Sequence, residues 1–306
     1  MLAFVFPGQG AQYTGMGKDL SEDFAVAREV FEEANDALGF NIAKLCYAGP
    51  AADLQLTTNT QPAILTMSVA ALRVVQQETG LMPDFVAGHS LGEYSALVAS
   101  GTITFADAVC LVRQRGAFMQ QAVSVGVGAM AAILGIDIEL LEKVCLEAAQ
   151  GDVVSPANYN SPGQVVIAGH SAAVDRAIAL AKENGARKAM LLPVSAPFHC
   201  ALMLPAGQQL KVVLDEINLN TLNIPVVTNV EAVANSDCLR VKDLLISQVS
   251  APVCWDRSVR YMIDQGVEEF IEIGPGKVLS GLIKRIDRSV ATQNVGDVKS
   301  LIKLQK

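Results

Sequence analysis

The sequence has few aromatic residues, few charges and few histidines, and these shortages exclude several classes of protein. Aromatic residues make up 5% of the 306 positions, charged residues make up 18%, and histidine occurs 3 times. A hydrophobic fraction of 51% excludes a disordered chain, because disorder requires low hydrophobicity and high charge. The length suits one large domain or two of ordinary size, and the composition predicts a helix-rich α/β enzyme.

Basic residues are also in short supply. Lys and Arg number 23 against 31 Asp and Glu, a net charge of -8, so no nucleic-acid partner is expected. No apolar run approaches the roughly 18 residues that a membrane-spanning helix needs. The first basic residue is Lys18, so the amino terminus lacks the basic start of a signal peptide. We therefore expect a cytoplasmic protein without a membrane partner.

The six cysteines are scattered, and neither a CxxC pair nor a histidine at metal-ligand spacing accompanies them. This pattern predicts no metal site and no disulfide framework. We interpret the cysteines as small apolar residues of the core. They are Cys46, Cys110, Cys145, Cys200, Cys238 and Cys254.

Short apolar runs that end in glycine-rich loops are typical of buried parallel strands. Residues 2–6 contain no polar side chain and are followed directly by Pro-Gly-Gln-Gly. Strands that alternate with helical stretches predict a parallel sheet covered on both faces. The strands predicted in this way are residues 2–6, 85–87, 224–228 and 270–273, and helices are predicted at residues 93–100 and 279–286.

One region departs from this rhythm and predicts a second domain. Between residues 128 and 194 the order of elements is βαββαβ, the ferredoxin-like arrangement. We predict a small ferredoxin-like domain at residues 127–195, inserted into a larger discontinuous domain of residues 1–126 and 196–306. The connecting segments, residues 124–127 and 195–197, are hinge candidates. The small domain's strands are predicted at residues 130–134, 153–159, 164–168 and 189–194, and its helices at residues 138–149 and 172–184.

The sequence Gly-His-Ser-Leu-Gly at residues 88–92 matches the GxSxG nucleophile elbow. A predicted strand precedes it and a predicted helix follows it, which is the context that the elbow requires. The turn would expose the hydroxyl of Ser90 and place the amide of Leu91 where an oxyanion forms. The alternative is a glycine-rich turn between strand and helix without a catalytic role.

A nucleophilic serine needs a general base, and only three histidines are available. His89 adjoins Ser90 on the same tight turn, so its ring should point away from the hydroxyl. His170 ends a strand inside the predicted small domain. His199 lies where the chain returns to the large domain, and elimination makes it the candidate base, although a structural histidine is the alternative. An ordinary α/β-hydrolase carries its histidine late, after an Asp or Glu, so a group other than a carboxylate is a candidate to orient His199.

Five sequence motifs together resemble the malonyl-CoA:acyl carrier protein transacylase family of type II fatty acid synthesis, over nearly the whole chain. The chain is also similar to the acyltransferase domains of polyketide and animal fatty acid synthases, but a chain of 306 residues favours the discrete enzyme. The resemblance implies an α/β-hydrolase-like large domain that carries a ferredoxin-like small one. The motifs are FPGQGAQ at 6–12, GHSLGEY at 88–94, QRGAFMQ at 114–120, APFH at 196–199 and Gln248 seven residues before Trp255.

The resemblance implies a ping-pong acyl transfer. Ser90 would attack the thioester of malonyl-CoA, and His199 would take the serine proton and give it to the leaving thiol. The phosphopantetheine thiol of acyl carrier protein would then attack the acyl-serine. Malonyl-CoA and acyl carrier protein are thus expected as substrates, with no cofactor, and we expect a monomer.

The backbone amides of Gln9 and Leu91 would hold the oxyanion by the same resemblance. The loop position of Gln9, directly after the first predicted strand, supports this role, although a simple tight turn is the alternative. Gln248 would orient His199 through its backbone carbonyl. Phe198 would narrow the acyl pocket against an α-methyl group.

Arg115 would pair with the free carboxylate of the malonyl group, as the resemblance implies. Its position supports this role, because it falls on an apolar helical stripe, and a buried arginine needs an anion that its paired donors suit. A structural salt bridge to an Asp or Glu is the alternative. The stripe consists of Phe105, Ala108, Val109, Val112, Gly116 and Met119.

Two functions other than acyl transfer are alternative interpretations of the sequence. A serine thioesterase or esterase would use the same Ser90 and His199, but a general esterase has no use for a charge in its acyl pocket. A catalytically silent scaffold would not need either residue. A malonyl-selective acyltransferase of a polyketide pathway also remains an alternative. Because the carrier protein is acidic, we predict a local basic surface for it, with the candidates Arg187, Lys188, Lys284, Arg285 and Arg288. A solvated helix face without a docking role is the alternative for these residues.

Overall fold

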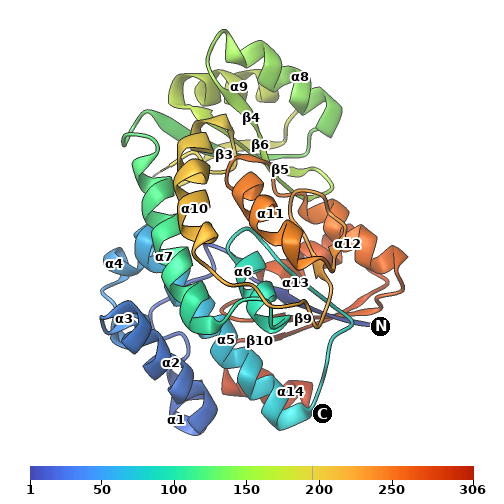
Figure 1. Ribbon diagram of the computed structural model, residues 1–306. Helices are drawn as coiled ribbons and strands as arrows, with labels where there is room; N and C mark the ends of the chain where they lie inside the picture. Colours follow the sequence, from blue (N-terminus) through green and yellow to red (C-terminus); the bar gives the residue numbers. More distant parts are fainter. Residues whose placement is uncertain (195) are drawn as a thin grey trace.

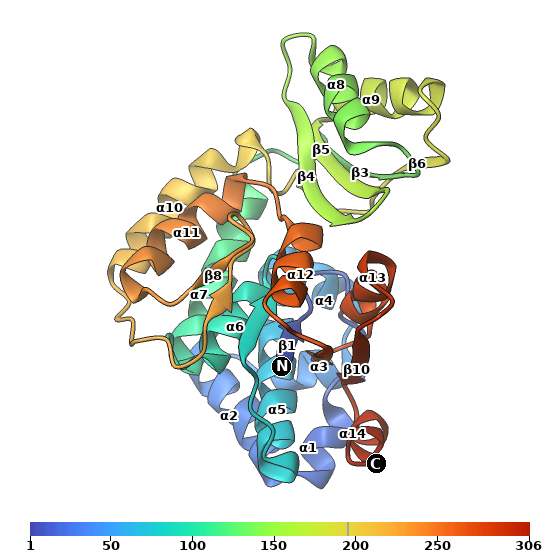
Figure 2. The ribbon, with the colours of Figure 1, turned by 90° about the vertical axis from the view of Figure 1, so that its right-hand side faces the viewer.

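The computed structural model describes residues 1–194 and 196–306, and these residues form two separate sheets (Figure 1). The larger sheet has the strand order β10-β9-β1-β2-β7-β8, and the smaller has the order β4-β5-β3-β6. Figure 2 shows the smaller sheet and its two helices set apart from the rest of the molecule. The predicted fold class, a parallel sheet with an inserted ferredoxin-like unit, is confirmed.

Five strands of the larger sheet run parallel, as the apolar runs predict. The sixth strand, β8, pairs antiparallel with β7 at the edge. The strand predicted at residues 224–228 is only two residues long, and directly after it the chain turns back, where the amide of Thr228 bonds to the carbonyl of Val233. The strands are β1 (Leu2–Phe6), β2 (Phe85–Gly88), β7 (Val226–Val227), β8 (Ala234–Asn235), β9 (Glu269–Ile273) and β10 (Ala291–Val295).

Helices cover both faces of this sheet. Side chains alternate along β1, so Phe4 and Phe6 join one core while Ala3 and Val5 join the other. The long helix α5 is buried along most of its length in the first core. The helices are α1 (Lys18–Asp23), α2 (Ala25–Leu38), α3 (Ile42–Ala48), α4 (Ala51–Gln55), α5 (Thr57–Thr79), α6 (Gly92–Ala99), α7 (Phe105–Gln121), α10 (Leu204–Asp215), α11 (Cys238–Ser250), α12 (Trp255–Asp264), α13 (Val278–Ile286) and α14 (Val298–Leu304), with a 3-10 turn at Ala201–Met203.

The smaller sheet is antiparallel and carries two helices against a core of its own. Its element order is βαββαβ, as predicted. The domain boundaries proposed from the sequence stay a prediction, and Ser195 of the second hinge candidate lies outside the described residues. The elements are β3 (Gly128–Leu134), α8 (Ile138–Ala149), β4 (Val154–Ser161), β5 (Gln164–His170), α9 (Ser171–Glu183) and β6 (Lys188–Leu191).

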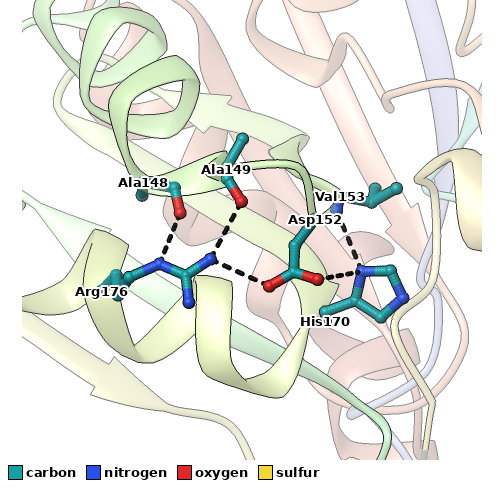
Figure 3. A network of polar contacts seen from close by, with 6 residues as sticks. All are labelled: Ala148, Ala149, Asp152, Val153, His170 and Arg176. Atoms are coloured by element: carbon teal, nitrogen blue, oxygen red, sulfur yellow. Dashed lines mark hydrogen bonds and ion pairs between the residues drawn. The ribbon is translucent and has the colours of Figure 1, made fainter.

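A polar network joins the end of α8 to α9 and to the start of β4 (Figure 3). Arg176 donates from Nε to the carbonyl of Ala148 at 2.7 Å and from Nη2 to the carboxylate of Asp152 at 2.9 Å. His170 accepts a hydrogen bond at Nδ1 from the amide of Val153 at 2.9 Å. The imidazole of His170 therefore supports the small sheet, and it takes no part in a contact with Ser90.

None of the helices in the described part of the chain is long and apolar enough to cross a membrane. The six cysteines are free thiols, and four of them are buried, which agrees with their interpretation as core residues.

Candidate active site

Ser90 lies at the sharp turn between β2 and α6. Its backbone has φ 51°, in the left-handed region that residues other than glycine rarely adopt. A Cβ atom at Gly88 would come within 1.9 Å of the backbone of Gly92, and one at Gly92 within 2.0 Å of the Phe6 carbonyl oxygen. Glycines on both sides thus allow the tight geometry that presents the serine hydroxyl, as the elbow motif predicts.

His199 is hydrogen-bonded to Ser90. Its Nε2 atom lies 2.7 Å from the Ser90 Oγ atom, and its Nδ1 atom lies 2.8 Å from the backbone carbonyl oxygen of Gln248. Because a carbonyl only accepts, Nδ1 carries the proton and Nε2 accepts from the serine hydroxyl. Burial, and then the charge of Arg115, lower the pKa of His199 to about 3. The imidazole is therefore neutral at pH 7 and able to accept a proton.

The other two histidines lie elsewhere. The ring of His89 points toward the smaller sheet, with Nε2 2.8 Å from Oδ1 of Asn160 on β4, and packs 5.8 Å from the ring of Trp255. His170 is held in the network described above. Within the described residues, His199 is thus the histidine that contacts the Ser90 hydroxyl.

Arg115 reaches the nucleophile from the buried stripe of α7. Its side chain is 1% exposed and donates to Oε1 of Gln61 at 2.8 Å, to Oε1 of Gln248 at 2.9 Å and to Oγ of Ser90 at 3.2 Å. No carboxylate in the described part of the chain lies within 4.0 Å of it, so these contacts contain no structural salt bridge. Its Nε atom is buried without a hydrogen-bond partner. The guanidinium therefore lies beside the serine with its charge unpaired by direct contact.

Six of the seven candidate residues line one cavity of about 120 Å³. Gln248, the seventh, lies behind this cavity and contacts both His199 and Arg115. The opposite wall comes from β3, β4 and the segment after β6, through Met130, Asn158, Leu192 and Val194. The cavity thus lies between the two sheets. The candidate residues that line it are Gln9, Ser90, Leu91, Arg115, Phe198 and His199.

Asn229 holds the backbone of the elbow, and the sequence analysis did not identify it. Its Oδ1 atom accepts from the amide of Ser90 at 2.7 Å, and its Nδ2 atom donates to the carbonyl of Gly88 at 2.6 Å. Asn229 follows the short strand β7 at the carboxyl end of the parallel sheet. This position could have identified Asn229 from the sequence, because ligand-binding residues gather at the carboxyl edge of a parallel sheet.

Glu93 and Gln61 also belong to the site, and neither is predicted as a site residue from the sequence. Glu93 is 2% exposed, and its Oε2 atom accepts from the amide of Asn229 at 3.0 Å and from Nε2 of Gln248 at 2.8 Å. Burial raises the pKa of Glu93 to about 7. Glu93 stands inside the GHSLGEY motif, but nothing in the motif shows that its carboxylate is buried. Gln61 sits in the apolar helix α5, and its contact with Arg115 spans distant segments.

Two groups of candidate docking residues come together around a second cavity, of about 350 Å³. Arg285 of α13 donates to Oε1 of Gln164 on β5 and lines this cavity with Arg187 and Lys188. Lys284 and Arg288 are exposed nearby in sequence but do not line it. As for metals, the described residues contain no cluster of three or more His, Cys, Asp or Glu side chains arranged to bind an ion.

Comparison with known proteins places the chain in an acyltransferase family. Residues 3–306 match the model of the acyl transferase domain family. The chain is 55% identical to the malonyl CoA-acyl carrier protein transacylase of Escherichia coli K12, over 93% of this chain and 92% of that protein.

Two solved structures are similar throughout. The acyl carrier protein S-malonyltransferase of Vibrio cholerae is 52% identical, with a TM-score of 0.97 and 99% of each chain covered. A malonyl-transacylase in complex with a type II polyketide synthase acyl-carrier protein is 48% identical, with a TM-score of 0.97, over 99% of this chain and 98% of that one.

Proposed function

This chain belongs to the acyl transferase family, and we propose that it transfers a malonyl group from malonyl-CoA to the phosphopantetheine thiol of acyl carrier protein. The observation that carries the malonyl assignment is Arg115. A buried guanidinium 3.2 Å from the nucleophile Oγ, without a carboxylate partner among the described residues, suits an acyl group that brings its own carboxylate. Relatives with this activity are similar over nearly the whole chain.

The first half-reaction forms an acyl-enzyme. The Ser90 Oγ atom attacks the thioester carbonyl while its proton passes to Nε2 of His199. The backbone amides of Gln9 and Leu91 stabilise the oxyanion of the tetrahedral intermediate. When the carbon-sulfur bond breaks, His199 returns the proton to the CoA thiolate. The Gln248 carbonyl stabilises the transient imidazolium through the Nδ1 proton.

The second half-reaction reverses these steps with a new thiol. His199 accepts the proton of the phosphopantetheine thiol, the sulfur attacks the malonyl ester, and Ser90 leaves with its proton restored. We propose that the reaction needs no cofactor, because His199 accounts for every proton transfer. The cytoplasmic location inferred from the sequence stays a prediction.

Selection of the acyl group follows from the walls of the small cavity. The two acceptor amides of Gln61 and Gln248 hold the guanidinium of Arg115, so that its remaining donors can pair with the malonyl carboxylate. Phe198 lines the same cavity and limits space beside the reacting carbon. A charged carboxylate in this buried place would be poorly solvated without Arg115.

The carrier protein docks, in this proposal, at the basic cavity formed by Arg187, Lys188 and Arg285. Lys188 is the first residue of β6 and Arg187 directly precedes it, whereas Arg285 lies on α13 beside the larger sheet, so this cavity, like the candidate acyl cavity, is lined from both units. An acidic carrier would meet positive charge there although the chain as a whole carries -8.

The test is a mass measurement on both half-reactions. The protein is incubated with malonyl-CoA alone and with malonyl-CoA plus holo acyl carrier protein. We expect a malonyl adduct on Ser90 in the first sample and malonyl carrier protein in the second. Release of free malonate without transfer would instead identify a thioesterase, and an adduct on any other residue would reject Ser90 as the nucleophile.

A further inference from the structure

Glu93 is a buried acid that touches neither the cavity nor the reacting atoms, yet it contacts the residues that organise them. It is 2% exposed, and Oε2 accepts from the Gln248 side chain at 2.8 Å and from the amide of Asn229 at 3.0 Å. We infer that Glu93 is a positioning residue, whose ionised carboxylate holds the side-chain amide of Gln248 in the orientation that bonds Arg115 and the backbone carbonyl of Ser90. This inference rests on the proposed function.

The orientation of the Gln248 amide depends on its partners, because its two ends have the same shape. In the observed orientation Nε2 donates to the carbonyl of Ser90 at 3.0 Å and to Glu93, while Oε1 accepts from Arg115. A flipped amide would direct its oxygen at two acceptors and its NH2 group at a guanidinium. The carboxylate excludes that flip, because it only accepts when ionised.

The same arrangement places the negative charge of Glu93 near Arg115 without a direct ion pair between them. No cation in the described residues lies within 4.0 Å of Glu93, and Arg115 lies on the other side of the Gln248 amide. The amide dipole points its NH2 end at the carboxylate and its oxygen at the guanidinium, which favours both charges. Direct contact between the two ions would instead occupy donors that the malonyl carboxylate needs.

Titration gives this arrangement a measurable signature. Burial raises the pKa of Glu93 to about 7, against the lowering effects of Gln248, Asn229 and Arg115. The titratable groups that interact with it are Arg115 and Tyr94, and burial raises the pKa of Tyr94 to about 12. His199, whose pKa is lowered to about 3, contacts it only through Gln248. None of them changes charge near neutral pH. Acylation should therefore rise with pH as Glu93 ionises.

The decisive variant is Glu93→Gln, which resembles the protonated acid at every pH. The rate of Ser90 acylation by malonyl-CoA is measured by rapid quench between about pH 5.5 and about pH 8.5. Wild type should rise about tenfold across this range, because hydrogen bonds to a charged acceptor are the stronger ones. Glu93→Gln should be flat and remain near the low-pH rate of wild type. Glu93→Asp keeps a carboxylate and should keep a rise with pH.

Thermal unfolding of the same variants separates positioning from support of the fold. A raised carboxyl pKa means that ionisation of Glu93 reduces the stability of the fold as pH rises through 7. Glu93→Gln should therefore unfold at a higher temperature than wild type at about pH 8.5 and still react more slowly. A purely structural role does not combine greater stability with a lower rate.

Glu272→Gln is the matched control. Glu272 is also fully buried and also has a pKa raised by burial, but its carboxylate accepts from the amides of Leu279 and Ser280 at the start of α13. The pH profile of acylation by the Glu272→Gln variant should match that of wild type. The inference is overturned if Glu93→Gln keeps the wild-type pH profile, or if it is slower by a constant factor and less stable. Adduct formation by wild type tests the proposed function by itself. The comparison of the variants with wild type therefore tests this inference alone.

Discussion

The backbone carbonyl of Gln248 lies 2.8 Å from Nδ1 of His199, in the position that a carboxylate holds in an ordinary serine triad. A neutral acceptor leaves the imidazole proton localised on Nδ1 without adding a negative charge to a pocket that contains Arg115. A carboxylate there would compete with the substrate for the guanidinium. The carbonyl thus suits an enzyme that selects an anionic acyl group.

Removal of the nucleophile should abolish acylation, whereas removal of the base should only slow it. Ser90→Ala should form no adduct with malonyl-CoA, because the attacking oxygen is gone. His199→Ala should slow adduct formation by about two to four orders of magnitude, the usual loss when a general base is removed. Quenched-flow mass spectrometry measures both rates. His170→Ala is the control, since His170 contacts Val153 rather than Ser90, and its rate should match wild type.

Substitution of Arg115 should change the choice of substrate. Arg115→Ala leaves the malonyl carboxylate buried without a partner, a penalty of about 3 to 5 kcal/mol, so malonyl acylation should fall by roughly two to three and a half orders of magnitude. Acetyl-CoA has no carboxylate, and its rate should hold steady or rise. Arg115→Lys should restore only part of the malonyl rate, because lysine lacks the paired donors.

The control for this prediction lies on the same helix. Arg113 packs 4.2 Å from the ring centre of Phe40 and donates to the Leu38 carbonyl, so Arg113→Ala should keep the preference for malonyl-CoA. Competition between malonyl-CoA and acetyl-CoA gives the ratio directly. Equal slowing of both substrates by Arg115→Ala would make Arg115 a structural residue.

Charge reversal at the basic cavity should affect only the carrier half-reaction. The double substitution Arg187→Glu and Arg285→Glu should lower the rate of transfer to acyl carrier protein and make that rate less sensitive to salt. Acylation by malonyl-CoA should hardly change. Stopped-flow measurement of each half-reaction at two ionic strengths tests this, with Lys299→Glu on α14 as the control. Equal losses in both half-reactions would argue against docking at this cavity.

Two glycine substitutions should have opposite effects on stability. Gly92→Ala would bring its Cβ within 2.0 Å of the Phe6 carbonyl oxygen, so the elbow must shift, and we expect a loss of about 3 kcal/mol, the upper end of what overpacked sites usually lose. Gly281→Ala on α13 meets nothing within 4 Å and should stabilise the protein by about 0.5 to 1 kcal/mol. Urea unfolding measures both. An unchanged Gly92→Ala protein would show that the elbow tolerates a side chain.

The sequence predicts those parts of the site that depend on local geometry. Ser90 is recognisable because small residues must flank the turn, and His199 follows because a serine nucleophile needs a base. Gln248 could be assigned only by family resemblance, since its backbone carbonyl does the work and any residue has one. The roles of Glu93 and Asn229 arise from contacts between segments more than 130 positions apart, which no local pattern reveals.

The fold shows the same division. Apolar runs predict β1 and β2 because buried parallel strands need them, and the βαββαβ order of the smaller unit is visible from its alternating strand and helix patterns. The strand predicted at residues 224–228 extends beyond β7 at both ends, and at the carboxyl end the chain turns at Thr228, whose amide bonds to Val233. Hydrophobic periodicity determines where a strand lies more reliably than where it ends.

The cavity beside Ser90 is lined from both sheets, and this has a consequence for how such a protein can evolve. The nucleophile, base and guanidinium belong to elements around the larger sheet, whereas Met130 and Asn158 approach from the smaller one. Mutation on the smaller sheet can therefore reshape the space for the acyl chain while the hydrogen bonds of Ser90 and His199 stay intact. The shape of the acyl pocket can therefore change by mutation on the smaller sheet, whereas the choice of an anionic acyl group stays tied to Arg115 and to the nucleophile it contacts.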